Sequence, residues 1–402
     1  MLKRLFAVVA LLPTFLVVRA HVLFDTTKPQ SSKPIVKAAV GKGVQFSSAD
    51  GLYTLTLNGR IQSLAEVRYS LQDKSAATDF LIRRCRLNIA GNFFNERFSY
   101  RVQLGFAQGD ISAANSAAQN NLILRDAMLY FKAQNWLTIG FGQTKLPGNR
   151  QRQISSANLQ LVERSIVNNN FTLDRDKGIW LYGSFPIGKS QFNPTFSISS
   201  GEGRITSAKN GKICLSGRIE WLPFGTFIDR GDFVEADVQQ EPAPKLSLGL
   251  VYSKNNAATR TMGQLGEYLY NNETADIDYW GADLLFKYKG FSTESEFYHR
   301  KSSKGIIINN GNTALKNFVL SGTGFMLQSG IFIAKQDELA ARFAIINPNE
   351  KIKLLASKQQ EWVLGYSHYF TKHNLKIQTD LTYFKEGMQE SLIYRLSGVV
   401  SF

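Results

Sequence analysis

The chain has 402 residues, with 44% hydrophobic and 12% aromatic side chains, a mean hydropathy of −0.17 and a formal net charge of +15. After the N-terminal segment no apolar run approaches the roughly 20 residues of a spanning helix, which excludes a helical membrane protein. The positive charge comes without a helix-turn-helix, zinc-finger or RNA-binding signature, so we expect no nucleic-acid partner.

Residues 1–20 have the features of a secretory signal peptide. Lys3 and Arg4 precede an apolar run from Leu5 to Val18, and small residues occupy the two positions that a signal peptidase reads. Cleavage would leave 44 basic and 32 acidic residues, a net charge of +12. In an exported protein this surplus favours the attraction of small anions. A basic surface that is merely solvated, or that contacts lipopolysaccharide, is an equally open alternative.

Residues 21–50 are polar and contain Pro29, Ser31, Ser32 and Pro34. We expect an irregular extension on the periplasmic side, because such a segment has little apolar surface to bury. No Pro- or Ser-rich linker divides the rest of the chain, so residues 51–402 are expected to form one domain.

From residue 51 onward, segments of alternating polar and apolar residues follow one another. One of them has Phe98, Tyr100 and Val102 on one face and Ser99 and Arg101 on the other. About sixteen such segments predict an all-β fold, a transmembrane antiparallel β-barrel with its apolar face toward outer-membrane lipid and its polar face toward the lumen. The expected strands are 52–62, 80–92, 97–107, 122–132, 136–145, 176–185, 191–201, 212–222, 244–254, 276–289, 290–300, 322–334, 337–346, 358–370, 374–384 and 391–402.

The connections between these strands alternate in length. Long ones are expected at 63–79, 108–121, 146–175, 202–211, 255–275, 301–321, 347–357 and 385–390, whereas the intervening ones are as short as 93–96 and 371–374. Outer-membrane barrels have long loops outside the cell and short turns in the periplasm. The link 223–243 is a long and acidic exception on the periplasmic side, and the pattern does not explain its length.

The chain ends on an alternating strand. Leu392, Tyr394 and Phe402 share one face, and Arg395 lies on the other. An apolar terminal strand left unpaired would invite aggregation, so we expect this strand to close the barrel. Its sequence resembles the C-terminal signal by which outer-membrane barrels are recognised for insertion, so barrel-assembly machinery is an expected partner through Phe402.

Four motifs follow one another between the second expected strand and the end of the longest loop. They are Phe80-Leu81-Ile82-Arg83-Arg84-Cys85-Arg86-Leu87, Gly142-Gln143-Thr144-Lys145-Leu146-Pro147, Glu163-Arg164-Ser165 and Asp174-Arg175-Asp176-Lys177-Gly178. Their succession resembles that of the phosphate-selective porin O and P family, and weaker likeness runs on to Phe402. The resemblance implies a homotrimeric barrel whose third external loop folds into the lumen and whose basic side chains guide anions. After Pro147 this chain has Gly148-Asn149-Arg150, where the family commonly has an aromatic residue, a serine and a nearby glutamate.

The segment 146–175 is too long and too polar for a turn, and a barrel of this width has room for an inward loop. Basic residues on this segment and on the strands beside it are expected to form an anion pathway, because rings of arginine and lysine replace the hydration that an anion loses. These residues are Arg60, Arg84, Arg86, Arg101, Lys145, Arg150, Arg152, Arg164 and Arg175. Glu163, Asp174 and Asp176 are acidic residues that could neutralise some of them, in which case the arginines would hold the loop in place.

The expected function is a porin in the outer membrane of a Gram-negative bacterium, forming a passive, anion-preferring diffusion channel, with phosphate or polyphosphate as the narrowest hypothesis. A general small-solute porin and a non-conducting, receptor-like barrel are the alternatives. An outer-membrane hydrolase is remote, because the chain has only four histidines and neither a G-x-S-x-G nor an H-E-x-x-H motif. No cofactor and no metal are expected, and Cys85 and Cys214 are expected to be free thiols.

Overall fold

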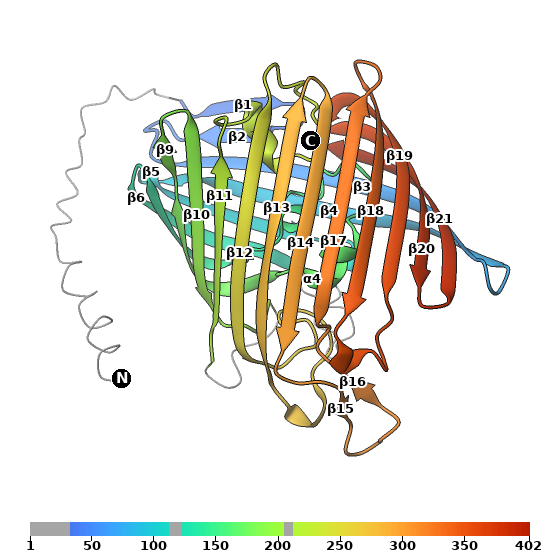
Figure 1. Cartoon of the computed structure of the whole chain (residues 1–402). Helices are drawn as coiled ribbons and strands as arrows, with labels where there is room; N and C mark the ends of the chain where they lie inside the picture. The colour runs from blue at the N-terminus through green and yellow to red at the C-terminus, as the bar shows by residue number, and fades with distance from the viewer. Residues whose placement is uncertain (1–32, 112–122, 205–211) are drawn as a thin grey trace, which may run out of the picture.

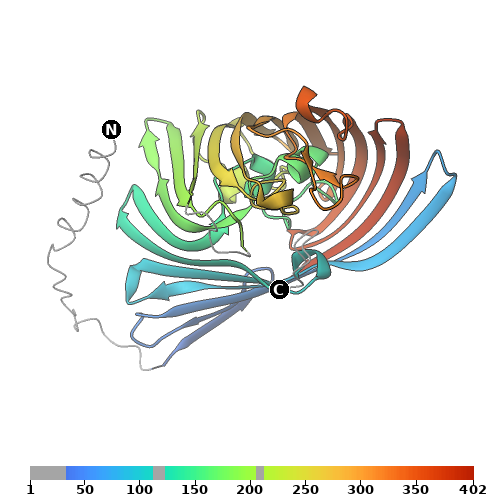
Figure 2. The same cartoon turned by 90° about the horizontal axis from the view of Figure 1, so that it is seen from below.

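The computed structural model describes residues 33–111, 123–204 and 212–402. Sixteen antiparallel strands pair in chain order, and the last pairs with the first to close a barrel (Figures 1 and 2). The barrel strands are β3 (Thr54–Ser70), β4 (Ser75–Phe93), β5 (Asn95–Gly105), β6 (Leu124–Gln134), β7 (Leu137–Lys145), β8 (Arg175–Gly183), β10 (Ser190–Ser199), β11 (Cys214–Leu222), β12 (Lys245–Ala258), β13 (Ala275–Tyr288), β14 (Phe291–Ser302), β17 (Gly322–Phe332), β18 (Asp337–Pro348), β19 (Gln359–His373), β20 (Leu375–Glu386) and β21 (Gln389–Ser401).

Short elements lie between or before the barrel strands. The additional strands are β1 (Ile35–Ala39), β2 (Gly43–Ser47), β9 (Phe185–Ile187), β15 (Ile307–Ile308) and β16 (Lys316–Asn317). The helical elements are α2 (Gln108–Ile111), α3 (Arg150–Gln153), α4 (Ile166–Phe171), η1 (Ile228–Phe233), η2 (Tyr270–Asn272) and η3 (Glu350–Ile352). Among the described residues, no helix is long and apolar enough to cross a membrane.

The two faces of the barrel differ as the alternation predicts. Leu250 on β12 and Leu364 on β19 are each 64% exposed and point outward, whereas their neighbours Val251 and Val363 are buried. Large apolar side chains that are this exposed suit contact with lipid. The inner face is polar, and Gln62 of β3 donates to Ser397 of β21 at 3.1 Å across the closing pair of strands.

Aromatic pairs mark the end of the barrel that carries the short turns. The rings of Phe192 and Trp221 stack with centroids 5.7 Å apart, and those of Trp136 and Phe185 lie 5.3 Å apart. Aromatic rings at this end of the strands fit an interfacial girdle, in which an aromatic side chain contacts both the lipid chains and the polar headgroups.

The expected strands all appear, but two expected long loops are short turns. β3 runs on to Ser70 and β4 begins at Ser75, so four residues remain of the expected loop 63–79. Likewise β20 and β21 are separated only by residues 387–388, although 385–390 was expected to be long. The charged residues Glu66 and Arg68 favoured a loop for residues 63–79. They lie on β3 instead, because a polar lumen accepts charged side chains on a strand.

The prediction of an irregular N-terminal extension was wrong for its described part. β1 and β2 form a hairpin, and β2 pairs with the start of β3 from Val44↔Leu57 to Ser47↔Thr54. The expected signal peptide lies outside the described residues, as do most of the expected loops 108–121 and 202–211. Cys85 and Cys214 are free.

The two ends of the barrel differ. Loops 259–274 and 303–321, which contain η2 and the β15–β16 hairpin, gather at the lower end in Figure 1, and the β1–β2 hairpin and the C-terminus lie at the upper end. The turns at the upper end are short, such as Lys289-Gly290 between β13 and β14. The exception is the connection between β11 and β12, which bends into the barrel and buries Glu235, Ala236 and Asp237.

Candidate functional site

Residues 146–174, between β7 and β8, turn into the barrel and are called the inward loop (Figure 2). The loop contains α3 and α4, and Ser165 caps the start of α4. Leu146, Val167 and Phe171 are fully buried in a cluster with strand residues. The expected inward fold of the third external loop is thus confirmed, and a small apolar core holds it inside an otherwise polar barrel.

Arg150 fastens the start of the inward loop to the wall formed by β11, β12 and β13. Its guanidinium donates to Asp283 at 2.8 Å and lies 2.9 Å from Glu220, and Arg218 reaches Asp283 from the other side at 2.6 Å. Burial favours the neutral form of Arg150, but Asp283 and Glu220 more than compensate and raise its pKa. The positive charge of Arg150 is therefore neutralised in a buried cluster.

Arg83 and Arg84 hold the far part of the inward loop to β4. Arg84 donates to Glu163 at 2.9 Å, and Arg83 donates to both carboxylate oxygens of the same residue. Two adjacent strand residues can face one carboxylate because β4 has a bulge here: Gln62 pairs with Arg84 and Ser63 with Ile82, which leaves Arg83 as the extra residue. Burial alone would raise the pKa of Glu163, but Arg84 and Arg83 lower it to about 2.

Arg60 and Arg86 converge on one residue of the inward loop. Arg60 donates to Ser156 at 2.9 Å and Arg86 donates to the same hydroxyl at 2.8 Å. Arg86 also forms two hydrogen bonds with Asp110, at 2.6 and 2.9 Å, and Arg125 donates to that carboxylate at 2.7 Å. Burial favours the neutral form of Asp110, but the two arginines outweigh it and lower its pKa.

Two more of the expected pathway residues, Arg152 of the inward loop and Arg175 at the start of β8, are paired as well. Arg175 donates to Asp126 at 2.8 Å, and Arg152 forms an ion pair with Asp174. Within the described residues, Asp176 forms no ion pair with an expected pathway residue; its carboxylate accepts from the Ser200 hydroxyl and from the backbone amides of Gly201 and Gly203. Asp174 and Glu163 thus act as the sequence analysis allowed, as partners that hold basic side chains.

Four of the nine expected pathway residues have no carboxylate within 4.0 Å among the described residues. They are Arg60, Arg101, Lys145 and Arg164. Lys145 donates to the carbonyl of Gln153 at 3.0 Å, and Arg164 donates to the carbonyls of Gln151 and Ile154 at 2.7 and 2.8 Å. Carbonyl oxygens satisfy these donors without cancelling the charge. Arg101 is exposed on the inner face of β5.

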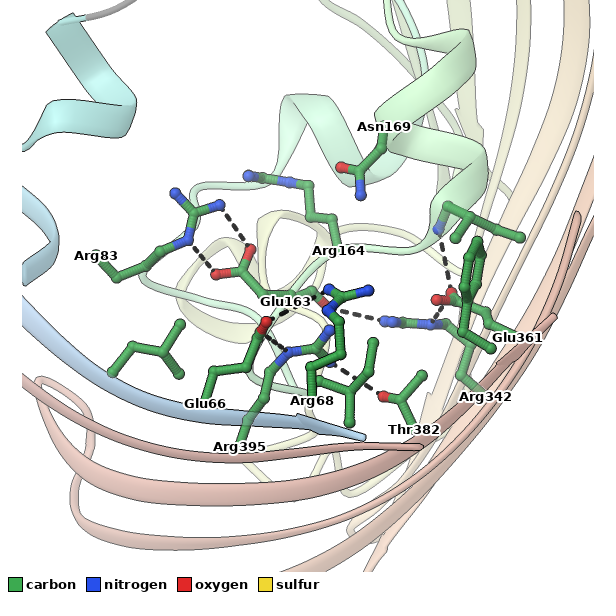
Figure 3. A pocket seen from close by; sticks show the side chains of 14 residues that line it. Glu66, Arg68, Arg83, Glu163, Arg164, Asn169, Arg342, Glu361, Thr382 and Arg395 are labelled. Atoms are coloured by element: carbon green, nitrogen blue, oxygen red, sulfur yellow. Dashed lines mark hydrogen bonds and ion pairs between the residues drawn. The ribbon is translucent and has the colours of Figure 1, made fainter. Parts of the chain in front are cut away.

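A cavity of about 260 Å³ remains between the inward loop and the part of the wall made by β3, β4, β18, β19, β20 and β21. Figure 3 shows arginines converging on it from both sides, with Arg164 from the loop and Arg395 and Arg342 from the wall. Its charged lining consists of Arg68, Arg83, Arg164, Arg342 and Arg395, with Glu66, Glu163 and Glu361. Three carboxylates face five guanidinium groups, so the lining of this cavity is net positive.

Several lumen arginines are not among the nine expected pathway residues. Arg125, Arg218, Arg342 and Arg395 point inward from β6, β11, β18 and β21, and each forms a buried ion pair. The alternation of polar and apolar residues was a usable signal for Arg218, Arg342 and Arg395, since each lies on the polar face of its strand. Arg125 and Arg83 had no such signal, because each is the extra residue of a β-bulge, and a bulge cannot be recognised in the alternation.

Comparison with known proteins supports this architecture. Residues 55–210 match the family model described as phosphate-selective porin O and P. The resemblance to that family is confirmed over this segment. An uncharacterized protein of Aquifex aeolicus (strain VF5) is 22% identical, and the match covers 94% of this chain and 93% of that protein.

Several solved structures with a similar fold are outer-membrane porins or channels. An anion-selective porin from Comamonas acidovorans has a TM-score of 0.55 at 12% identity, covering 87% of this chain and 100% of that one. The outer-membrane channel DcaP of Acinetobacter baumannii has a TM-score of 0.52 at 12% identity, covering 90% of this chain and 100% of that one. The family match and the porin fold together support an outer-membrane location and a channel rather than an enzyme.

Proposed function

We propose that the protein is a porin whose lumen passes small solutes by passive diffusion and prefers anions. The observation that carries the proposal is that four of the nine expected pathway residues have no carboxylate partner in the described part of the chain: Arg60, Arg101, Lys145 and Arg164. The other basic residues of the pathway are neutralised locally and hold the inward loop. Unpaired charges in a narrow, partly desolvated lumen create a potential that enriches anions.

The proposal is tested by reversal potentials across a salt gradient in planar bilayers. Replacing Arg101, Lys145 and Arg164 together by glutamine should lower the chloride-to-potassium permeability ratio at low salt. A matched control replaces Lys254, Lys304 and Lys353, three exposed lysines near the ends of strands or in loops, and removes the same formal charge. An equal effect of both variants would contradict a filter formed by the lumen residues. A wild-type ratio near unity would favour a general small-solute porin.

Phosphate is the narrower form of the proposal, supported by the match to a family described as phosphate-selective. Phosphate added to the chloride solution should then block chloride current saturably, because a binding site fills whereas a general basic pore does not. Block that rises linearly with phosphate would leave only the general anion preference. No current from a correctly assembled barrel would instead favour a non-conducting, receptor-like protein.

A homotrimer is part of the proposal, since the family resemblance implies one. Chemical crosslinking in native outer-membrane extracts should give a ladder that ends at three subunits. A single band at the mass of one subunit after crosslinking would contradict the homotrimer.

A further inference from the structure

The connection between β11 and β12, residues 223–244, fills part of the lumen from the short-turn end, and we call it the inner turn. Phe227 is 5% exposed, Glu235 is 2% exposed and Ala236 is fully buried. Lys287 on β13 holds the inner turn from the wall, because its ammonium donates to the carbonyls of Gly231 at 2.9 Å and Ala236 at 2.7 Å. The segment is therefore packed inside the barrel.

The inner turn meets the inward loop inside the lumen. The backbone amide of Glu235 donates to the carbonyl of Asn158 at 3.1 Å, and the Asn158 side chain donates to the carbonyl of Phe233 at 3.0 Å. The Glu235 carboxylate accepts from the backbone N–H of Gln160 at 2.8 Å and from the side-chain amide of Gln151 at 3.3 Å. It also accepts from Gln328 of β17 at 3.0 Å. One buried carboxylate thus ties together the inner turn, the inward loop and the wall.

We propose that the inner turn is a second constriction of the channel, which limits the size of passing solutes and holds the inward loop through Glu235. This inference rests on the proposed channel function. Steric exclusion follows from its position, because the segment shares the lumen with the inward loop and contacts it directly. Other turns at this end, such as 289–290, are too short to enter the lumen.

The charge of the inner turn gives the proposal a second consequence. It contains five acidic residues, Asp229, Asp232, Glu235, Asp237 and Glu241, and one basic residue, Arg230. Its net charge of −4 opposes the entry of anions at this end of the channel. Removing the inner turn should therefore raise both the conductance and the chloride-to-potassium permeability ratio. A pore that became wider without losing acidic charge would be less selective, and its permeability ratio would fall.

The test replaces residues 225–244 by Asn-Gly. Trp221 pairs with Leu248, so the same register joins Phe224 to Lys245 through a two-residue hairpin loop, which Asn-Gly favours. Single-channel conductance in planar bilayers should rise about twofold or more, since conduction depends on the narrowest part of the pore. The chloride-to-potassium ratio should rise as well. Wild-type values of both in a barrel that keeps heat-modifiable gel mobility would overturn the proposal.

A pair of point variants tests the link through Glu235 if the replacement prevents folding. Glu235→Gln places an amide donor among the donors of Gln151, Gln160 and Gln328. Glu241→Gln removes the same charge from an equally buried residue, whose carboxylate accepts, within the described residues, only from the backbone amide of Ile228 in the inner turn. The first variant should show more frequent steps between current levels than the second. Identical traces from the two would contradict the proposed role of Glu235.

The outcomes separate this inference from the proposed function. If the wild type conducts and neither the replacement nor Glu235→Gln changes the current, only the second constriction is wrong. If the wild type is silent and the replacement conducts, the inner turn closes the lumen and the proposed passive channel is wrong. If neither protein conducts although both barrels assemble, both proposals fail.

Discussion

Arg150 and Asp283 form a buried ion pair, with 2.8 Å between Nε of Arg150 and Oδ1 of Asp283, which fastens the inward loop to β13. Glu220 lies 2.9 Å from the same guanidinium, so the charge of Arg150 is cancelled where it lies. Arg150 therefore holds the loop that narrows the channel, and we expect it to contribute more to stability than to ion selectivity.

Replacing Arg150 by glutamine should destabilise the protein by roughly 3–5 kcal/mol, because it leaves buried carboxylates without their partner. The temperature at which the folded band converts to the unfolded band on a gel measures this loss. Lys304→Gln is the control, since Lys304 pairs with Glu273 at 2.9 Å on the surface, where such a pair is worth at most about 1 kcal/mol. Equal shifts for both variants would show that the buried cluster does not hold the loop.

Arg101 should behave in the opposite way. It is exposed on the inner face of β5 and forms no ion pair with a described residue. Arg101→Gln should leave the unfolding temperature near the wild-type value and lower the chloride-to-potassium ratio at low salt. The effect should fade at 1 M salt, where the Debye length is about 3 Å. A ratio that does not change at low salt would place Arg101 outside the ion pathway.

The strand pattern of this fold could be predicted from the sequence because a barrel strand meets lipid on one side and the lumen on the other. The alternation of Phe98, Tyr100 and Val102 with Ser99 and Arg101 carries that information locally. The pairing of the arginines could not be predicted in the same way. Arg150 and Asp283 are 133 residues apart in the chain, and only the closed barrel brings them together.

Two local features also escaped prediction for physical reasons. The bulge at Arg83 changes the direction of one side chain without changing the composition of β4. The inner turn looked like an overlong periplasmic link, because its acidic residues suit solvent as well as they suit the donors inside the lumen. Glu235 is buried only because Gln151, Gln160 and Gln328 surround it with hydrogen-bond donors.

Deleting Phe402 should reduce insertion into the outer membrane. Phe402 exchanges backbone hydrogen bonds with Gly59, at 2.7 and 3.0 Å, and so completes the pairing of β21 with β3. Its ring also covers Gly59, where a Cβ atom would lie 2.6 Å from a ring carbon. Gly59→Val should therefore mimic the deletion. Wild-type amounts of heat-modifiable barrel from both variants in membrane fractions would contradict closure through this contact.

The difference between the two barrel ends predicts which sites can be labelled on intact cells. Tags inserted near residues 265 and 310, in the long loops, should be accessible from outside. A tag near Lys372, at the β19–β20 turn at the other end, should be protected until the outer membrane is opened. Labelling at Lys372 on intact cells would reverse the assignment of sides.

The stabilisation provided by Glu163 should disappear in acid. Burial favours its neutral form, yet Arg84 and Arg83 lower its pKa from 4.5 to about 2. A carboxyl group whose pKa falls on folding contributes its full stabilisation above its unfolded pKa, and this contribution is lost as the pH falls through the folded value. The difference in unfolding temperature between the wild type and Glu163→Gln should therefore be constant from pH 7 to about 5 and shrink as the pH falls toward about 2. Glu350→Gln, on an exposed side chain, should show little difference at any pH. A wild-type advantage over Glu163→Gln that is as large near pH 2 as at pH 7 would mean that the ion pairs with Arg83 and Arg84 do not stabilise the inward loop.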